Sequence, residues 1–86
     1  MGSYRIELTR DAVKSLTGFD RTTQSRIRAA VDSLAVDPRP SGSCKLAGGF
    51  GEWRIRVGDY RIVYEIHDGR LLVLVVRAAH RRGVYR

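Results

Sequence analysis

Apolar and polar side chains alternate in two parts of this chain. Tyr4 to Thr9 (YRIELT) place apolar residues at every second position, and residues 53–66 (WRIRVGDYRIVYEI) do so on both sides of a Gly58-Asp59 break. Alternation with a period of two is typical of half-buried β-strands, because successive side chains point to opposite faces of a sheet. It predicts a first strand at residues 4–9 and two later strands, at Glu52 to Val57 and Tyr60 to His67.

Between the first strand and the later ones, the apolar spacing changes to that of helices. Thr9 can cap a short helix over residues 10–19, which Gly18 interrupts, and Asp20 can cap a longer helix over residues 21–37, which Pro38 stops. The apolar positions of the longer helix follow the i, i+3, i+4, i+7 rule; they are Ile27, Ala30, Val31 and Leu34. The two helices are expected to form a hairpin.

The remaining segments complete the predicted sheet. Residues 38–52 are rich in glycine, serine and proline, which predicts a loop that extends briefly at Cys44 to Leu46. Arg70 to Arg77 predict a last strand, preceded by a type I′ turn at Asp68-Gly69. Because this strand is almost continuously apolar, we expect it to be central and covered on both faces.

The order strand, helix, helix, strand, strand, strand predicts an α+β fold. In it the helical hairpin packs on one face of a sheet that contains a three-stranded antiparallel meander. With 86 residues, of which 43% are hydrophobic and 29% charged, we expect one domain over residues 1–86. No apolar run reaches the roughly 18 residues of a membrane span, and residues 1–10 lack the apolar core of a signal peptide, so a cytoplasmic protein is expected.

Positive charge is concentrated in the second half of the chain. Residues 1–52 carry 8 Lys+Arg against 6 Asp+Glu, whereas residues 53–86 carry 8 against 3, giving net charges of +2 and +5. A concentrated positive field attracts polyanions, so nucleic acid or an acidic protein is the expected partner. Cys44 is the only cysteine, which excludes an internal disulfide and a cysteine-based zinc site within one chain.

Three arginines fall on the polar side of the alternating strands. If Trp53, Ile55 and the apolar set of the next strand face the helices, then Arg54, Arg56 and Arg61 converge on the opposite face. Like charges repel, so an anion such as phosphate would account for the cluster. The alternative is a solvated face on which arginine stems lie over apolar neighbours.

The end of the chain adds groups suited to cleaving RNA. They are His80, Arg81, Arg82, Tyr85 and Arg86. Histidine, with an unperturbed pKa of about 6.5, and tyrosine can move protons, while arginines hold a phosphate and stabilise its developing charge. The carboxylates suggest no magnesium site, since Asp59 and Asp68 fall in turns and Glu65 is isolated, so we expect no metal and no cofactor. We interpret His67 as a strand-end residue, and Trp53 and Tyr64 as core.

Two segments of the sequence resemble a known family. CKLAGGFGEWRIRVGDYRIVYEI, followed by LLVLVVRAAHRRGVYR, is similar to the RelE toxins of bacterial type II toxin-antitoxin modules, within the RelE/ParE superfamily. The resemblance covers the whole chain, and its specific parts are K-L before the glycines, W-R-I-R-x-G-D-Y-R-I-V-Y and the terminal H-R-R-x-V-Y. It implies a toxin that cleaves mRNA in the ribosomal A site without metal, leaves a 2′,3′-cyclic phosphate, and is neutralised by a RelB-like antitoxin with an acidic, amphipathic segment.

The resemblance also implies roles for single residues. Arg54 and Arg56 stand where studied members have functional lysines, Arg61 matches a phosphate-binding arginine, Arg81 a residue that stabilises the transition state, and Tyr85 a tyrosine that stacks on or orients the substrate. Contacts to RNA are expected from Lys45, Arg77, Arg82 and Arg86. Arginine has a pKa above about 12 and is a poor base, so His80 is the preferred proton-transfer group and Tyr85 the alternative.

A second departure from the family concerns the end of the sequence, and one alternative function also remains. Some relatives continue into a further helix where this sequence ends one residue after Tyr85. The alternative function is that of the ParE branch, whose members inhibit DNA gyrase without nuclease activity. Such members usually lack the basic residues and the tyrosine seen here, which favours an endoribonuclease (an mRNA interferase) acting with the ribosome and mRNA as partners.

Overall fold

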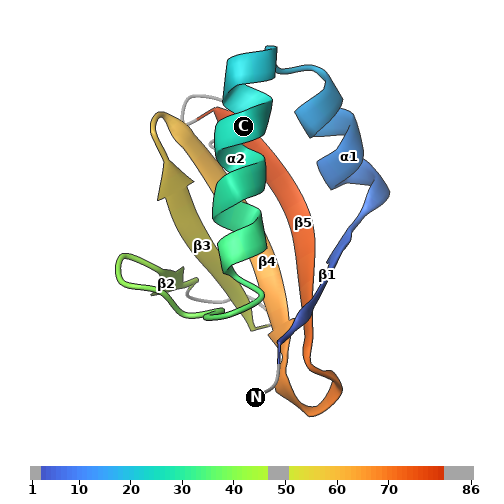
Figure 1. The fold of residues 1–86 in the computed structure, drawn as a ribbon, viewed down its shortest axis with the longest axis vertical. Coiled ribbons are helices and arrows are strands. Elements are labelled where there is room, and N and C mark those ends of the chain that lie inside the picture. The colour runs from blue at the N-terminus through green and yellow to red at the C-terminus, as the bar shows by residue number, and fades with distance from the viewer. Residues whose placement is uncertain (1–2, 47–50, 81–86) are drawn as a thin grey trace.

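A computed structural model describes residues 3–46 and 51–80. The elements follow the chain in the order β1 (Arg5–Leu8), α1 (Arg10–Thr17), α2 (Arg21–Ser33), β2 (Cys44–Lys45), β3 (Glu52–Val57), β4 (Tyr60–His67) and β5 (Leu72–His80) (Figure 1). A single 3₁₀ turn, Asp68–Arg70, lies between β4 and β5. The α+β order predicted from the sequence is confirmed, and the brief extension at Cys44 is the short strand β2.

The five strands form one mixed sheet with the order β1-β5-β4-β3-β2. β1 runs parallel to β5, and the other neighbours are antiparallel, so β3, β4 and β5 form the predicted meander. β5 lies between β1 and β4, in agreement with the expectation of a central strand. The two helices lie side by side across one face of the sheet, and none of the described helices is long and apolar enough to cross a membrane (Figure 1).

Side chains cap both helices where the sequence predicted. The Thr9 hydroxyl accepts a hydrogen bond from the Ala12 N–H at 3.1 Å, and the Asp20 carboxylate accepts one from the Thr23 N–H at 2.8 Å. Hydrogen bonding from the Thr23 side chain, and then from its backbone N–H, lowers the pKa of Asp20 below its ordinary value, because both bonds stabilise the charged form. Each cap satisfies a backbone donor that the first turn of a helix leaves unpaired.

The longer helix ends earlier than expected, at Ser33 instead of residue 37. The N–H groups of the next three residues bond to carbonyls three positions back, as in Leu34 to Val31 at 3.0 Å, which tightens the chain into turns. Proline also disfavours helical backbone at the residue before it, so the helix cannot continue up to Pro38.

The prediction of a type I′ turn at Asp68-Gly69 is wrong. Asp68 begins the 3₁₀ turn, and the positive φ falls on Leu71, at 49°, so that β5 starts at Leu72 and extends to His80. Asp68 accepts hydrogen bonds from the Tyr4 hydroxyl at 2.6 Å and from the Arg39 guanidinium at 2.8 Å. These distant partners hold the turn in a shape that the local sequence does not specify.

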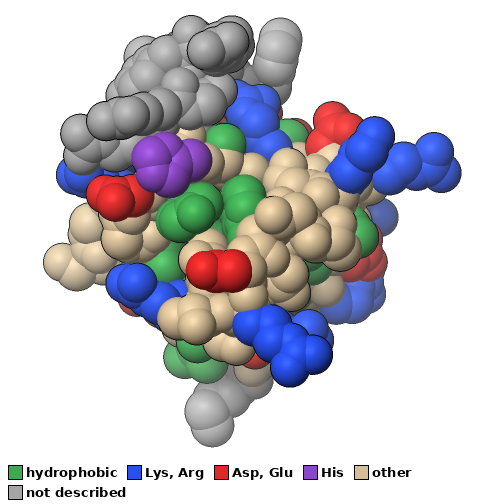
Figure 2. Space-filling view, turned by 90° about the horizontal axis from the view of Figure 1, so that it is seen from above, with side chains coloured by type: hydrophobic (Ala, Val, Ile, Leu, Met, Phe, Trp, Pro, Cys, Tyr) green, Lys and Arg blue, Asp and Glu red, His purple; other side chains and the backbone are tan. Residues whose placement is uncertain are grey.

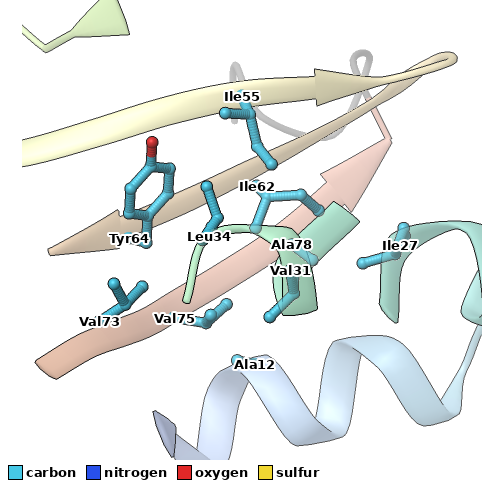
Figure 3. Close-up of a cluster of buried hydrophobic side chains, with 10 residues drawn as sticks. All are labelled: Ala12, Ile27, Val31, Leu34, Ile55, Ile62, Tyr64, Val73, Val75 and Ala78. Carbon is cyan, nitrogen blue, oxygen red and sulfur yellow. The ribbon is translucent and has the colours of Figure 1, made fainter. Parts of the chain in front are cut away.

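The core lies between the helices and one face of the sheet, where ten buried side chains meet (Figure 3). The helices and the turn after α2 contribute four of them, Ala12, Ile27, Val31 and Leu34, and the strands contribute the other six, Ile55, Ile62, Tyr64, Val73, Val75 and Ala78. The apolar sets of β3 and β4 therefore face the helices, as the alternation predicted. Tyr64 is a core residue, again as expected from the sequence, with no exposed surface.

Tyr64 gives the fold a pH-dependent stability at alkaline pH. Its hydroxyl donates a hydrogen bond to the Pro38 carbonyl at 2.7 Å, and burial raises its pKa from 10.0 to about 12. The folded state favours the neutral phenol, so this contribution to stability is complete below pH 10 and is lost as pH rises towards 12. We expect Tyr64→Phe to cost about 1–3 kcal/mol at pH 7.

Urea unfolding of the wild type and of Tyr64→Phe between pH 7 and 12 tests this account. The difference in unfolding free energy between the two proteins should shrink above pH 10. Tyr4, whose pKa is also raised by its hydrogen bond to Asp68, is present in both proteins and cancels. A difference that stays constant up to pH 12 would show that the Tyr64 hydroxyl does not ionise on unfolding as described.

Candidate functional site

Four arginines lie on the sheet face that the helices leave uncovered. The strand register places Arg56 directly opposite Arg61, and it places Arg54 and Arg77 on either side of Val63. Side chains that lie opposite each other on neighbouring strands share a face. Arg61 and Val63 alternate with Ile62 and Tyr64, which face the helices, so all four arginines point the other way. We call Arg54, Arg56, Arg61 and Arg77 the arginine face.

The convergence of Arg54, Arg56 and Arg61 agrees with the sequence prediction, but the position of Arg77 depends on a bulge. Val63 pairs with Arg77 and Tyr64 pairs with Val75, so Val76 is an extra residue in β5. In a regular strand Arg77 would share the face of Val75 and point into the core. The bulge reverses the alternation and turns Arg77 outward, which adds a fourth cation to the face.

The arginine face is compact and positively charged. Opposite residues on neighbouring strands have Cβ atoms about 5 Å apart, and successive cross-strand rows on one face are about 7 Å apart. Arg54 and Arg61 are half-buried, the Nε atom of Arg61 is fully buried, and Val63 between the arginines is 2% exposed. Half-buried guanidinium groups lose little further freedom when they bind an anion, and a phosphate would relieve the repulsion between them.

The structure does not bring His80 onto this face. His80 pairs with Tyr60, which belongs to the helix-facing set of β4, and its ring meets the Tyr60 ring edge-on at 5.2 Å. Tyr60 in turn packs on Phe19 in the turn between the helices, at 4.7 Å. Figure 2 looks down on the end of the molecule that is at the top of Figure 1 and shows hydrophobic side chains at its surface. His80 is close to Arg61 along the strands but lies on the other side of the sheet.

Of the other predicted site residues, Lys45 is the one that the structure describes. Lys45 is exposed on the edge strand β2 but pairs with Trp53, so it lies on the helix side of the sheet, and its neighbour Cys44 pairs with Arg54. The remaining four predicted residues lie outside the described part of the chain; they are Arg81, Arg82, Tyr85 and Arg86.

A charged contact fixes the segment that leads into β2. Arg39 bonds to the Asp68 carboxylate at 2.8 and 3.4 Å, and its guanidinium lies 5.3 Å from the centre of the Trp53 ring. The Arg39 guanidinium, and then the Tyr4 hydroxyl, hold the pKa of Asp68 below its usual value. Trp53 is half-buried against this contact and the core, in agreement with its interpretation as a core residue.

Comparison with known proteins decides the family. A family model described as the ParE toxin of the type II toxin-antitoxin system parDE matches residues 6–85. The chain belongs to this toxin family. It is a toxin of a RelBE/ParE-type toxin-antitoxin system, which confirms the RelE/ParE resemblance found in the sequence. No curated protein matches the sequence.

Solved structures of RelE toxins share the fold of this ParE-family chain. A chain of the archaeal RelE-RelB complex from Pyrococcus horikoshii OT3 is 25% identical to this chain. The match covers 92% of this chain and 96% of that chain, with a TM-score of 0.81. RelBE2 from Mycobacterium tuberculosis is 23% identical over 92% and 99%, with a TM-score of 0.82. The intact E. coli RelBE complex is 21% identical over 91% and 96%, with a TM-score of 0.80.

Proposed function

We propose that this toxin is a ribosome-dependent, metal-independent endoribonuclease that cleaves mRNA in the ribosomal A site and so inhibits translation. The observation that carries the proposal is the arginine face, where four cations gather on a sheet surface with no described helix over it. Electrostatic attraction to the phosphate backbone supplies much of the affinity of proteins for nucleic acids. The structural similarity to RelE toxins supports the same reaction.

In the proposed reaction the arginine face holds the scissile phosphate. The 2′-hydroxyl attacks the adjacent phosphorus, the bond to the 5′-oxygen breaks, and the products are a 2′,3′-cyclic phosphate and a 5′-hydroxyl. The guanidinium groups of Arg54, Arg56 and Arg61 stabilise the negative charge that develops on the phosphoryl oxygens. Arginine is an effective donor for this purpose because its planar fork matches two phosphate oxygens at once.

Two proton transfers complete the reaction, one from the 2′-hydroxyl and one to the 5′-oxygen. The sequence offers His80 and Tyr85 for them, together with Arg81 for charge stabilisation. Because His80 packs on Tyr60 across the sheet from Arg61, it could serve only if the RNA passed around the end of β5. We therefore give Tyr85 the larger part in proton transfer. Naked RNA should be cut poorly, because the ribosome orients the substrate that this small surface cannot hold alone.

The physiological partner that we propose is an antitoxin with an acidic, amphipathic segment. The similar structures include RelE bound to RelB from three organisms, which supports a partner of that type. An acidic segment laid over the arginine face would neutralise its charge and exclude RNA.

Inhibition of DNA gyrase is the second candidate function, and the match to the ParE family model favours it. One experiment separates the two functions. The purified toxin is added to a coupled transcription-translation extract, mRNA ends are mapped by primer extension, and gyrase-linked DNA breaks are trapped in parallel. We expect cuts within codons of translated mRNA and no increase in DNA breaks. Intact mRNA together with trapped breaks would replace the nuclease by a gyrase inhibitor.

A further inference from the structure

A carboxylate and a histidine lie on the same sheet face as the arginines, beyond one end of the arginine cluster. Glu65 pairs with Glu52 on one side and Leu74 on the other, in the row next to Arg54, Val63 and Arg77. The ring of His67 lies 2.8 Å from the Glu65 carboxylate, measured from Nε2 to Oε1. Their side chains are 38% exposed for His67 and 29% exposed for Glu65, so the pair is accessible and partly immobilised.

The spacing between the arginine face and Glu65 suits neighbouring nucleotides of one RNA strand. Successive rows on a sheet face are about 7 Å apart, which is comparable to one nucleotide of an extended strand. A phosphate bound by Arg54 and Arg77 would therefore place the adjoining nucleotide over the row of Glu65. Glu65 repels phosphate but can accept hydrogen bonds from the ribose 2′-hydroxyl or from the base of that nucleotide, and only the base differs between nucleotides.

A carboxylate accepts hydrogen bonds and donates none, which restricts the bases that it can bind. Adenine, cytosine and guanine each carry an exocyclic amino group that donates to such an acceptor. Uracil has carbonyl oxygens where the others have that amino group, and its one base-edge N–H donor, N3–H, lies between two carbonyl oxygens that repel a carboxylate, so its hydrogen bond to Glu65 is weaker. His67 limits the rotation of Glu65, so the acceptor has a preferred direction.

We infer that Glu65, oriented by His67, is a specificity-determining residue that recognises the base beside the cleaved phosphate and favours bases with an exocyclic amino group over uracil. The inference rests on the proposed nuclease function and extends it to the choice of cleavage site. Glu65 is not a catalytic residue in this account, because the reacting atoms lie over the arginine face.

The test is a map of cleavage sites for the wild type and Glu65→Gln, made by primer extension on translated mRNAs in which the base beside each cut varies. The wild type should cut next to uracil about tenfold less than next to the other bases. Glutamine can donate as well as accept, so Glu65→Gln should cut next to uracil as readily as elsewhere. His67→Ala, which frees the carboxylate, should reduce the wild-type preference without abolishing it.

The matched control is Glu7→Gln, which makes the same charge change on the same face. Glu7 lies opposite Leu74 at the β1 edge and is paired with Arg5 at 3.0 Å, two strands away from Glu65. It should keep the wild-type site preference. An unchanged site distribution in Glu65→Gln, or an equal change in Glu7→Gln, would overturn the inference. If the wild type cuts no mRNA at all, the proposed function fails as well.

Discussion

Arg61→Ala is expected to reduce mRNA cleavage by about 100- to 1000-fold, the usual cost of removing one donor to a developing oxyanion. Arg61 lies opposite Arg56 in the row of the arginine face next to the β3–β4 turn, and its Nε atom is buried, so its guanidinium is held in place before the substrate binds. Single-turnover cleavage of ribosome-bound mRNA measures the loss. The thermal midpoint should stay within a few degrees of the wild-type value, because the core lies on the other face.

Arg70→Ala is the matched control for charge. Arg70 is exposed in the 3₁₀ turn between β4 and β5, outside the arginine face, so its removal lowers the net charge equally and should leave cleavage nearly unchanged. His80→Ala adds a second comparison from the opposite face of the sheet. A proton-transfer group contributes about 100-fold or more, so a loss below about tenfold would remove His80 from that role. Equal activities of Arg61→Ala and Arg70→Ala would contradict the phosphate site.

Leu34→Ala should have the largest effect on stability. Leu34 is fully buried directly after α2, in the cluster that contains Tyr64, and such truncations cost about 2–5 kcal/mol because they lose apolar burial and leave a cavity. For a domain of this size that corresponds to a fall in Tm of roughly 10–30 °C. Thermal unfolding followed by circular dichroism measures it.

Val36→Ala is the control for this core variant. Val36 is two residues farther along the chain and 79% exposed, so its truncation should change the unfolding free energy by less than about 0.5 kcal/mol. A Leu34→Ala protein with the wild-type Tm would show that the helices do not pack on the sheet as described. Cleavage activity measured on Leu34→Ala also shows how much a folding defect alone reduces activity. The loss of activity in Arg61→Ala is compared with that value.

The bounds of β3 and β4 were predictable from the sequence because apolar and polar residues alternate along most of each strand. This alternation records which side chains face the helices. Glu52–Val57 and Tyr60–His67 are the strands that the alternation predicted, and Arg54, Arg56 and Arg61 lie on the predicted face. The caps at Thr9 and Asp20 were equally local, since each side chain bonds to the third residue after it.

β5 shows why the rest of the site could not be predicted. Its sequence from Leu72 to Val76 is continuously apolar, so the pattern does not show where the alternation shifts. Because of the bulge at Val76, each later residue of β5 points to the opposite sheet face from the one that a regular strand would give it. This brings Arg77 onto the arginine face and moves His80 to the other side. Glu65, which the sequence suggested was an isolated carboxylate, lies opposite Glu52 in the pairing of β3 with β4.

The most direct measurement uses purified ribosomes programmed with an mRNA whose A-site codon is known. The toxin is added to these complexes and to the same mRNA without ribosomes, and the products are mapped at single-nucleotide resolution. We expect a cut within the A-site codon that leaves a 2′,3′-cyclic phosphate, and little cutting of the free mRNA. Intact mRNA on the programmed ribosomes would contradict the proposal that the arginine face is a nuclease site.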